Sequence, residues 1–484
     1  MAGIGFALRK LADREELSSL LSGFVLSAIV AAGPWVLTTV GLLIVSYSSM
    51  GYFARVRDYL LFRSLVTFSF AGTLILVSLI QLPATRFVAD RFFEKEFSQV
   101  RSIYLTSAGL TLLAGLPLAG ILSFFLDLPA LTRVAYFDLL VVLMLLWITT
   151  ALVSTLHDYG SVGLGFFLGS AMSVAGTLLG ARYGDVPGAL FGYLLGQGLI
   201  VTLLAVRILV EFPGEIVWNP DFVRFLKQRG RLILLGLVMT LGIWIDKILY
   251  WYGPGSDRIV GYVHINHLYD IGMFFALLTV IPTLALFVFY FETGFYERYR
   301  AVFIQLEEGR PLSDVLEAKE QMIRFIRHGL GYILKIQGVV TFMAVLNAHG
   351  ILVLFHADLL SLPVFRMGAM GGFCQVILTM EFTLLLYFNQ EKMVIRLAGV
   401  LLLLNGALTL AGMAISPRLE GFGYLVACLF SAIYGYSLLD RGVCDFEFTV
   451  FMKPPDSVAE GPVQFAEGIP GSSPSLPGQV ATPS

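Results

Sequence analysis

The sequence predicts an all-α polytopic membrane protein with about twelve transmembrane helices. The first observation is composition, because 57% of the 484 residues are hydrophobic and only 14% are charged. Soluble domains carry roughly 25% charged residues, and the mean hydropathy here is +0.81. The second is a series of apolar runs, each long enough to cross a hydrocarbon core of ~30 Å. The third is an uneven distribution of Lys and Arg between alternate loops. Together they indicate a chain embedded in a bilayer.

The apolar runs define the predicted spans. The first contains Gly33 and Pro34 and is expected to bend there as a hinge, because proline cannot donate a backbone hydrogen bond. The ninth is interrupted by NAHG at 347–350, which leaves its end open. The predicted spans are residues 18–47, 61–83, 103–125, 134–156, 161–181, 187–210, 232–252, 268–291, 330–356, 364–388, 394–414 and 422–439.

Lys and Arg residues set the predicted orientation. With the N-terminus inside, the inner segments hold about 21 of them and the outer loops about 6. Because positive residues are enriched in cytoplasmic loops, both termini are predicted to be cytoplasmic. Residues 1–210 and 232–440 then hold six spans each, with a cytoplasmic linker at 211–231.

Two further segments are predicted to lie in the cytoplasm. Residues 441–484 are rich in Pro, Gly and Ser, which predicts a disordered tail. Residues 292–328 form the longest loop between spans. Within and just beyond it, SDVLEAKEQMIRFIRHG at 313–329 places apolar residues near one face, starting from a good cap and ending at a glycine. This predicts an amphipathic helix that lies on the membrane or docks a partner, and the alternative is a helical extension of the ninth span.

Small residues recur every four positions in the fifth and sixth spans. This spacing lets two helix backbones approach closely in lipid, so the two spans are predicted to form a tight hairpin. The glycines do not complete a dinucleotide-binding fingerprint, and the sequence holds no phosphate-binding GxxxxGK[ST] loop. The glycines assigned to helix packing are Gly165, Gly169, Gly188, Gly192 and Gly196.

An acid and a base lie side by side in the seventh span. The stretch LGIWIDKILYW (241–251) contains Asp246 and Lys247, and each charge costs roughly 2.5–3.5 kcal/mol at the centre of a span. Neighbouring residues on a helix point about 100° apart, so this pair is not expected to be satisfied within its own helix. Each residue is therefore predicted to need a separate partner on another helix, in water or in a substrate.

Other polar groups in the spans indicate a polar, water-accessible path. Ionisable residues within membranes usually face a bundle interior or a water-filled cavity, although Arg207 and similar residues near span ends also fit an interfacial role. No spacing of histidines or cysteines indicates a metal site, and no basic run indicates nucleic-acid binding. No catalytic residue and no cofactor is predicted. The residues assigned to the path are Asp246, Lys247, Glu381, Trp244, Arg207 and Lys335.

Three motifs carry a resemblance to a known family. The start MAGIGFALRKL, the stretch AAGPWVLTTVGLL (31–43) and LGIWIDKILYW with its Asp–Lys pair resemble the PelG family of Pel exopolysaccharide export proteins. The resemblance runs over essentially residues 1–450 and leaves the tail outside. It implies the fold of the multidrug/oligosaccharidyl-lipid/polysaccharide exporters, with two six-helix bundles around a central cavity.

The resemblance also implies a location, a cargo and partners. The location is the inner membrane of a Gram-negative bacterium. The cargo is a galactosamine-rich, partly N-acetylated polymer used in biofilm. The partners are a cytosolic PelF-type glycosyltransferase and two small membrane proteins of PelD and PelE type.

The hypothesis from the sequence is a conduit between the two bundles. Asp246 and Glu381 would bind sugar hydroxyls or amino groups, Lys247 would be held by an acid on another helix, and Trp244 would stack on a sugar face or anchor the membrane interface. The energy source, polymer synthesis or an ion gradient, stays open. Two alternatives are a drug/cation antiporter of the same superfamily and a non-transporting scaffold that anchors and activates the glycosyltransferase.

Overall fold

A computed structural model describes most of the chain. The described residues are 41, 44–45, 52–53, 55–94, 96–155, 159–290, 294–416 and 419–444. Most of the first predicted span, including the predicted hinge at Gly33 and Pro34, lies outside them, as do residues 445–484 of the predicted tail.

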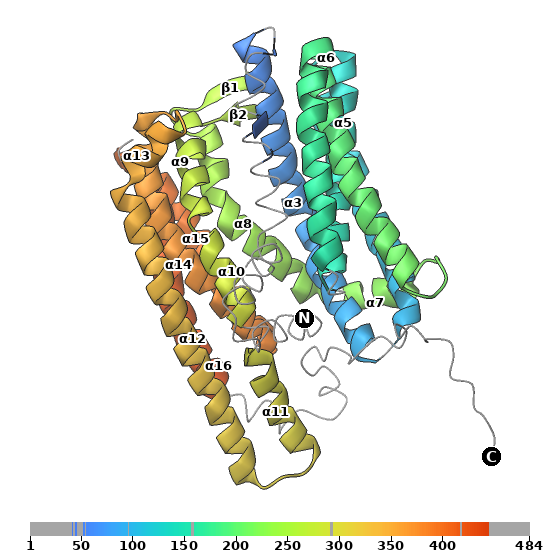
Figure 1. The fold of residues 1–484 in the computed structure, drawn as a ribbon, viewed down its shortest axis with the longest axis vertical. Helices are drawn as coiled ribbons and strands as arrows, with labels where there is room; N and C mark the ends of the chain where they lie inside the picture. The colour runs from blue at the N-terminus through green and yellow to red at the C-terminus, as the bar shows by residue number, and fades with distance from the viewer. Residues whose placement is uncertain are drawn as a thin grey trace, which may run out of the picture.

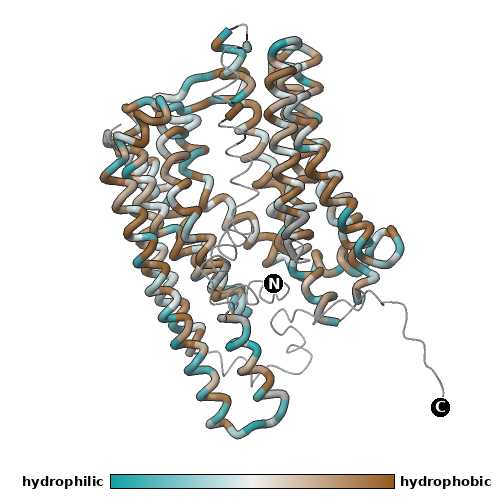
Figure 2. Tube along the Cα trace, in the orientation of Figure 1, coloured by the Kyte–Doolittle hydropathy of each residue, from teal (hydrophilic) through white to brown (hydrophobic). Residues whose placement is uncertain are grey.

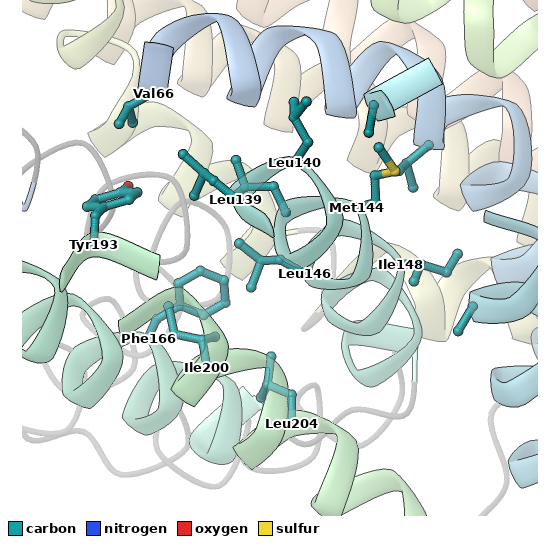
Figure 3. Close-up of a cluster of buried hydrophobic side chains, with 14 of the residues drawn as sticks. Val66, Leu139, Leu140, Met144, Leu146, Ile148, Phe166, Tyr193, Ile200 and Leu204 are labelled. Atoms are coloured by element: carbon teal, nitrogen blue, oxygen red, sulfur yellow. The ribbon is translucent and has the colours of Figure 1, made fainter. Parts of the chain in front are cut away.

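The first group of helices, called here the N-terminal bundle, consists of α3 to α6 (Figure 1). Its buried side chains form one apolar cluster, part of which Figure 3 shows, with Val66 from α3, Leu139 and Met144 from α5, and Phe166 and Ile200 from α6. This cluster fixes the relative positions of the four helices. The elements are α3 (Val56–Phe93), η1 (Phe97–Gln99), α4 (Val100–Phe124), α5 (Ala130–Thr155) and α6 (Tyr159–Glu211).

Helix α6 contains both the fifth and the sixth predicted span. The chain reverses at Asp185, whose φ of 50° and ψ of −137° are not helical. The two halves then lie so close that a Cβ at Gly169 would be 2.8 Å from the carbonyl oxygen of Gly196. Added Cβ atoms at Gly192 and Gly196 would overlap the backbone of the opposite half, whereas one at Gly165 would make an ordinary 3.5 Å contact with a leucine side chain. Glycine is therefore required along most of this seam.

The linker between the two groups of helices is folded and attached to the N-terminal bundle. It contains α7 (Pro220–Gln228), whose first turn is capped by the Asn219 side chain, which accepts from the Phe222 amide at 2.9 Å. The Phe222 ring is fully buried against Phe87. The Asn219 amide in turn donates to Thr106 of α4 at 2.8 Å. The linker is therefore packed on the N-terminal bundle.

The second group, called here the C-terminal bundle, has its own buried apolar cluster (Figure 1). It packs on the N-terminal bundle mainly through α3 and α8. Its elements are α8 (Gly230–Tyr252), β1 (Asp257–Val260), β2 (Val263–Ile265), α9 (His267–Leu278), α10 (Ile281–Tyr290), α11 (Tyr296–Glu307), α12 (Leu312–Leu346), α13 (Ala348–Leu354), η3 (Leu359–Ser361), α14 (Leu362–Tyr387), α15 (Glu391–Ile415) and α16 (Phe422–Cys444).

The prediction of a helical, multi-pass membrane protein is confirmed. Ten helical segments of the described chain are long and apolar enough to cross a membrane. One of them, Val162–Glu211, turns back on itself at Asp185 and so accounts for two of the predicted spans. Figure 2 shows the apolar character continuing along these helices in both bundles.

Two features of the fold depart from the predicted pattern of unbroken helices and plain loops. An antiparallel β-hairpin joins α8 to α9. The eighth span is broken between α9 and α10, where Pro282 lacks the amide that would bond the carbonyl of Leu278. The carbonyl of Thr279 at the break accepts from Gln337 of α12 at 3.4 Å, so a side chain of the ninth span replaces a backbone donor.

The predicted loop at 292–328 is mostly helical. Helix α11 and the first part of α12 form a hairpin that extends past the other helices, with a hydrophilic end (Figures 1 and 2). Helix α12 starts at Leu312 and continues through Gly329 to Leu346. The expected end at Gly329 was wrong, and the alternative, an extension of the ninth span, is correct. Gly329 lies inside the helix, and a glycine is needed there because Tyr290 packs in the space where a side chain would lie.

Candidate functional site

Asp246 is the centre of a buried polar cluster in the C-terminal bundle. Its side chain is fully buried on α8. The Tyr269 hydroxyl of α9 donates to Oδ2 at 2.5 Å, and Nδ2 of Asn405 on α15 approaches Oδ1 at 3.3 Å. Asn405 also donates to the carbonyl of Gly242 at 3.0 Å. Hydrogen bonds to an ionised group are worth about 1.5–3 kcal/mol each, so the cluster holds three helices together.

Lys247 completes the cluster and corrects an expectation. Its Nζ lies 3.1 Å from Oδ2 of Asp246 and donates to the carbonyl of Ile243 at 3.2 Å. The prediction that neighbouring residues cannot pair on one helix was therefore wrong. Lys247 was expected to pair with an acid on another helix, but the acid beside it is Asp246 of its own helix. The Lys247 side chain is long enough to curl back along its own helix toward residue 243, which brings the ammonium beside the carboxylate.

Aromatic rings surround the ammonium group. Nζ of Lys247 lies 5.4 Å from the centre of the Tyr424 ring and 5.9 Å from that of Trp244. Both distances fit a cation–π interaction. The ring of Tyr269, whose hydroxyl binds Asp246, stacks on that of Tyr250 with the ring centres 3.8 Å apart. The Lys247 side chain keeps 12% of its surface exposed, whereas that of Asp246 keeps none. Lys247 is thus the member of the pair that a bound molecule can reach.

A second polar contact lies near the C-terminal end of α8 and joins this helix to both bundles. Nε1 of Trp251 donates to the Asp270 carboxylate at 3.1 Å. The Trp251 ring stacks on Phe68 of α3, with the ring centres 4.4 Å apart. Phe68 belongs to the N-terminal bundle, so this aromatic pair lies between the two groups of helices.

The other residues assigned to the path lie apart from this cluster. Glu381 is buried in α14, with its carboxylate filling the space beside Gly435 of α16, and neither oxygen has a hydrogen-bond partner among the described residues. Arg207 is exposed on α6 and pairs with Glu211 at 3.0 Å. Lys335 is exposed on α12. Of the six predicted residues, Asp246, Lys247 and Trp244 are brought together.

Sequence reasoning missed Tyr269 and Tyr424 as members of the cluster. A buried tyrosine hydroxyl usually finds a hydrogen-bond partner, and both rings are buried within predicted spans. Tyr424 donates to Oε1 of Gln375. Their positions in apolar spans were a signal, but the choice of Asp246 as the partner of Tyr269 depends on how α8 and α9 pack.

Residues 1–451 match the protein family described as "PelG: Putative exopolysaccharide Exporter (EPS-E)". No curated protein sequence gives a significant match. The family match covers both bundles and leaves residues 452–484, most of the predicted tail, outside.

Solved transporter structures share the fold at low sequence identity. An inward-facing multidrug resistance MATE family transporter of the MOP superfamily has a TM-score of 0.61 and 13% identity, with 87% of this chain and 99% of that chain covered. An outward-facing structure described in the same way has a TM-score of 0.62 and 14% identity, with 88% and 96% covered. A MOP superfamily transporter from Pyrococcus furiosus, whose structure is described by the reverse polarity of its binding pocket, has a TM-score of 0.61 and 13% identity, with 88% and 96% covered.

Proposed function

Because the chain belongs to the PelG family of exopolysaccharide exporters, we propose that it moves a Pel-type polymer, rich in galactosamine and N-acetylgalactosamine, across a bacterial inner membrane. The direction is from the cytoplasm to the periplasm, in the production of biofilm matrix. The family match over residues 1–451 carries this proposal. The transporter fold of the MOP superfamily supports it, because both bundles are present in one chain.

The Asp246–Lys247 cluster is the proposed contact with the polymer. The buried carboxylate holds the ammonium group in one place, and the partly exposed Lys247 then has a proton to donate to a sugar oxygen. Trp244 is half-buried next to it and offers a ring face to a sugar. Asp246 itself has its oxygens occupied, so its role is to position Lys247 rather than to bind sugar directly.

The experiment that tests the function measures polymer on both sides of the membrane. Cells lacking the chain are expected to secrete little polymer and to retain what they make. Full secretion without the chain would refute the proposal. The scaffold alternative predicts a different result. Cells lacking the chain would then contain no polymer on either side, and a folded variant without the proposed polymer contact, such as Asp246→Asn with Lys247→Met, would restore polymer synthesis.

The similarity to MATE transporters favours one second candidate, a cation-coupled antiporter. Glu381 distinguishes it, because a buried carboxyl with no hydrogen-bond partner is stable in apolar surroundings only when protonated. We expect Glu381→Gln, which keeps the shape and removes the proton exchange, to leave polymer secretion within about twofold (roughly 0.4 kcal/mol), because Glu381 lies apart from the Asp246–Lys247 cluster that is proposed to contact the polymer. A loss of tenfold or more, with normal protein levels, would favour the antiporter.

The α11–α12 hairpin is the proposed contact for the PelF-type glycosyltransferase. It extends past the helices at the end assigned to the cytoplasm (Figure 1). It exposes Leu312 and Leu316, which are 59% and 42% accessible and lie one turn apart. PelD- and PelE-type membrane proteins are proposed to complete the complex, and the chain offers lipid-facing helices for them.

We expect Leu312→Asp with Leu316→Asp to reduce co-purification of the glycosyltransferase about tenfold or more, because charged groups at a central apolar contact weaken binding by 1.4 kcal/mol or more. The matched control is Gln321→Asp, which adds a charge on the same helix, five residues from Leu316 and therefore on a different face. Equal binding by both variants would place the partner elsewhere.

A further inference from the structure

The β-hairpin between α8 and α9, Asp257–Ile265, is called here the outer hairpin. It belongs to the C-terminal bundle by sequence and lies at the end that the Lys and Arg distribution assigns to the outside (Figure 1). Its strands pair from Asp257 with Ile265 to Val260 with Val263. Gly261 forms the turn with a φ of 52°, in the left-handed region that favours glycine.

The tip of the outer hairpin is inserted into the N-terminal bundle. Val263 is fully buried in the apolar cluster of that bundle. The Tyr262 hydroxyl donates to the carbonyl of Leu122 on α4 at 3.3 Å. It lies 3.2 Å from the Tyr136 hydroxyl of α5, which is left to donate to it. Burial raises the pKa of Tyr262 above its ordinary value, so its hydroxyl keeps the proton at neutral pH.

The fit of the turn is close. A Cβ placed on Gly261 would lie 2.9 Å from Cδ2 of Leu126 and 3.6 Å from its Cα. Leu126 is itself buried, in the turn between α4 and α5. The outer hairpin therefore covers the outer ends of two helices of the opposite bundle.

The base of the outer hairpin is fixed to its own bundle. The Tyr252 hydroxyl at the end of α8 also ties the tip to the C-terminal bundle, because it donates to the carbonyl of Tyr262 at 2.8 Å. Asn266 follows β2 directly and caps α9 by accepting from the Tyr269 amide at 3.1 Å. The hairpin consequently cannot stay inserted in the N-terminal bundle if the outer ends of the two bundles separate.

We propose that the outer hairpin is a latch that closes the outer side of the export path and must leave the N-terminal bundle during each opening. The proposal rests on the export function proposed above. The contact suits this use because it consists of one fully buried valine, three partly buried apolar side chains (Ile259, Val260 and Tyr262), a close-fitting turn and two tyrosine hydroxyls, and lacks an ion pair among the described residues. Its small size permits repeated release.

A reversible cross-link tests the latch. The added Cβ at Gly261 lies 3.6 Å from the Cα of Leu126, which puts the two Cα atoms at most about 5 Å apart, within reach of a disulfide, whose Cα atoms are roughly 4.4–6.8 Å apart. Cells carrying Gly261→Cys with Leu126→Cys are treated with an oxidant, and the linked fraction is measured on gels. Cys374 and Cys428 are buried and do not compete, and the third cysteine, Cys444, is replaced by serine in every variant. We expect secretion by the linked protein to fall at least tenfold and to return when a reductant is added to the medium.

Controls separate the latch from strain and from the export function. Gly261→Ala with Leu126→Cys carries the same backbone strain without a bond and is expected to secrete normally in oxidant. Leu126→Cys alone is expected to react with a membrane-impermeant thiol reagent from outside faster in cells that make polymer than in cells that do not. Unchanged secretion by fully linked protein would overturn the latch while leaving the export function in place. Normal secretion by cells that lack the chain would overturn the export function itself.

Discussion

Asp246→Asn is expected to lower the free energy of unfolding by roughly 3–5 kcal/mol, because it leaves the Lys247 ammonium in a mostly buried site without its carboxylate. The loss includes the charge-assisted bond from Tyr269, which holds α9 against α8. Polymer secretion is expected to fall at least tenfold even in cells whose protein level is restored. Stability is measured by denaturant unfolding in detergent, and polymer is measured separately in the medium and in the cells.

The double variant Asp246→Asn with Lys247→Met separates structure from transport. Replacing both members of a buried pair by neutral groups is often nearly neutral for stability, so most of the lost free energy should return. Secretion should not return, because the ammonium that contacts the polymer is gone. Recovery of both properties would make the pair purely structural and would remove Lys247 from the proposed path.

An exposed pair provides the comparison for the buried one. Asp221 and Arg224 on α7 are 3.8 Å apart and largely exposed. Such pairs contribute about 0–1 kcal/mol, so Asp221→Asn should change neither unfolding nor secretion measurably. If Asp221→Asn lowered stability and secretion as much as Asp246→Asn, the loss of a charge, and not its burial, would explain both effects.

Gly192→Ala is expected to destabilise the protein by roughly 1–3 kcal/mol or more, because the added methyl group would overlap the backbone of Gly176 in the other half of α6. Backbone atoms cannot move aside as a side chain can, so the two halves must separate. The measurements are the unfolding free energy in detergent and the amount of folded protein in the membrane.

Gly198→Ala is the matched control on the same half of α6. A Cβ at Gly198 meets nothing within 4 Å, and alanine favours a helix over glycine by about 0.8–1.0 kcal/mol. This substitution is therefore expected to be neutral or stabilising. If Gly198→Ala is as harmful as Gly192→Ala, the close approach of the two halves is not the reason for the glycines.

The sequence by itself determined the class of the fold and the approximate places of the helices. Hydropathy is a local property that adds up along the chain, so spans such as 103–125 and 394–414 coincide closely with α4 and α15. The four-residue spacing of glycines predicted the α6 hairpin, because helical geometry alone decides which residues share a face. This geometry is also a local property of the chain. The resemblance of the Asp246 motif pointed to the family that matches residues 1–451.

The tertiary structure alone decided which polar groups meet. Asn405 and Asp246 are 159 positions apart and touch only because α15 packs on α8. The break at Thr279 is supported by Gln337 from another helix. The outer hairpin is held by helices that precede it by more than 100 residues, as the contact of Tyr262 with Tyr136 illustrates. The hydrophobicity of a helix drives it into the membrane whatever helices lie beside it. A hydrogen bond between two helices, in contrast, exists only where packing brings its two atoms within about 3 Å.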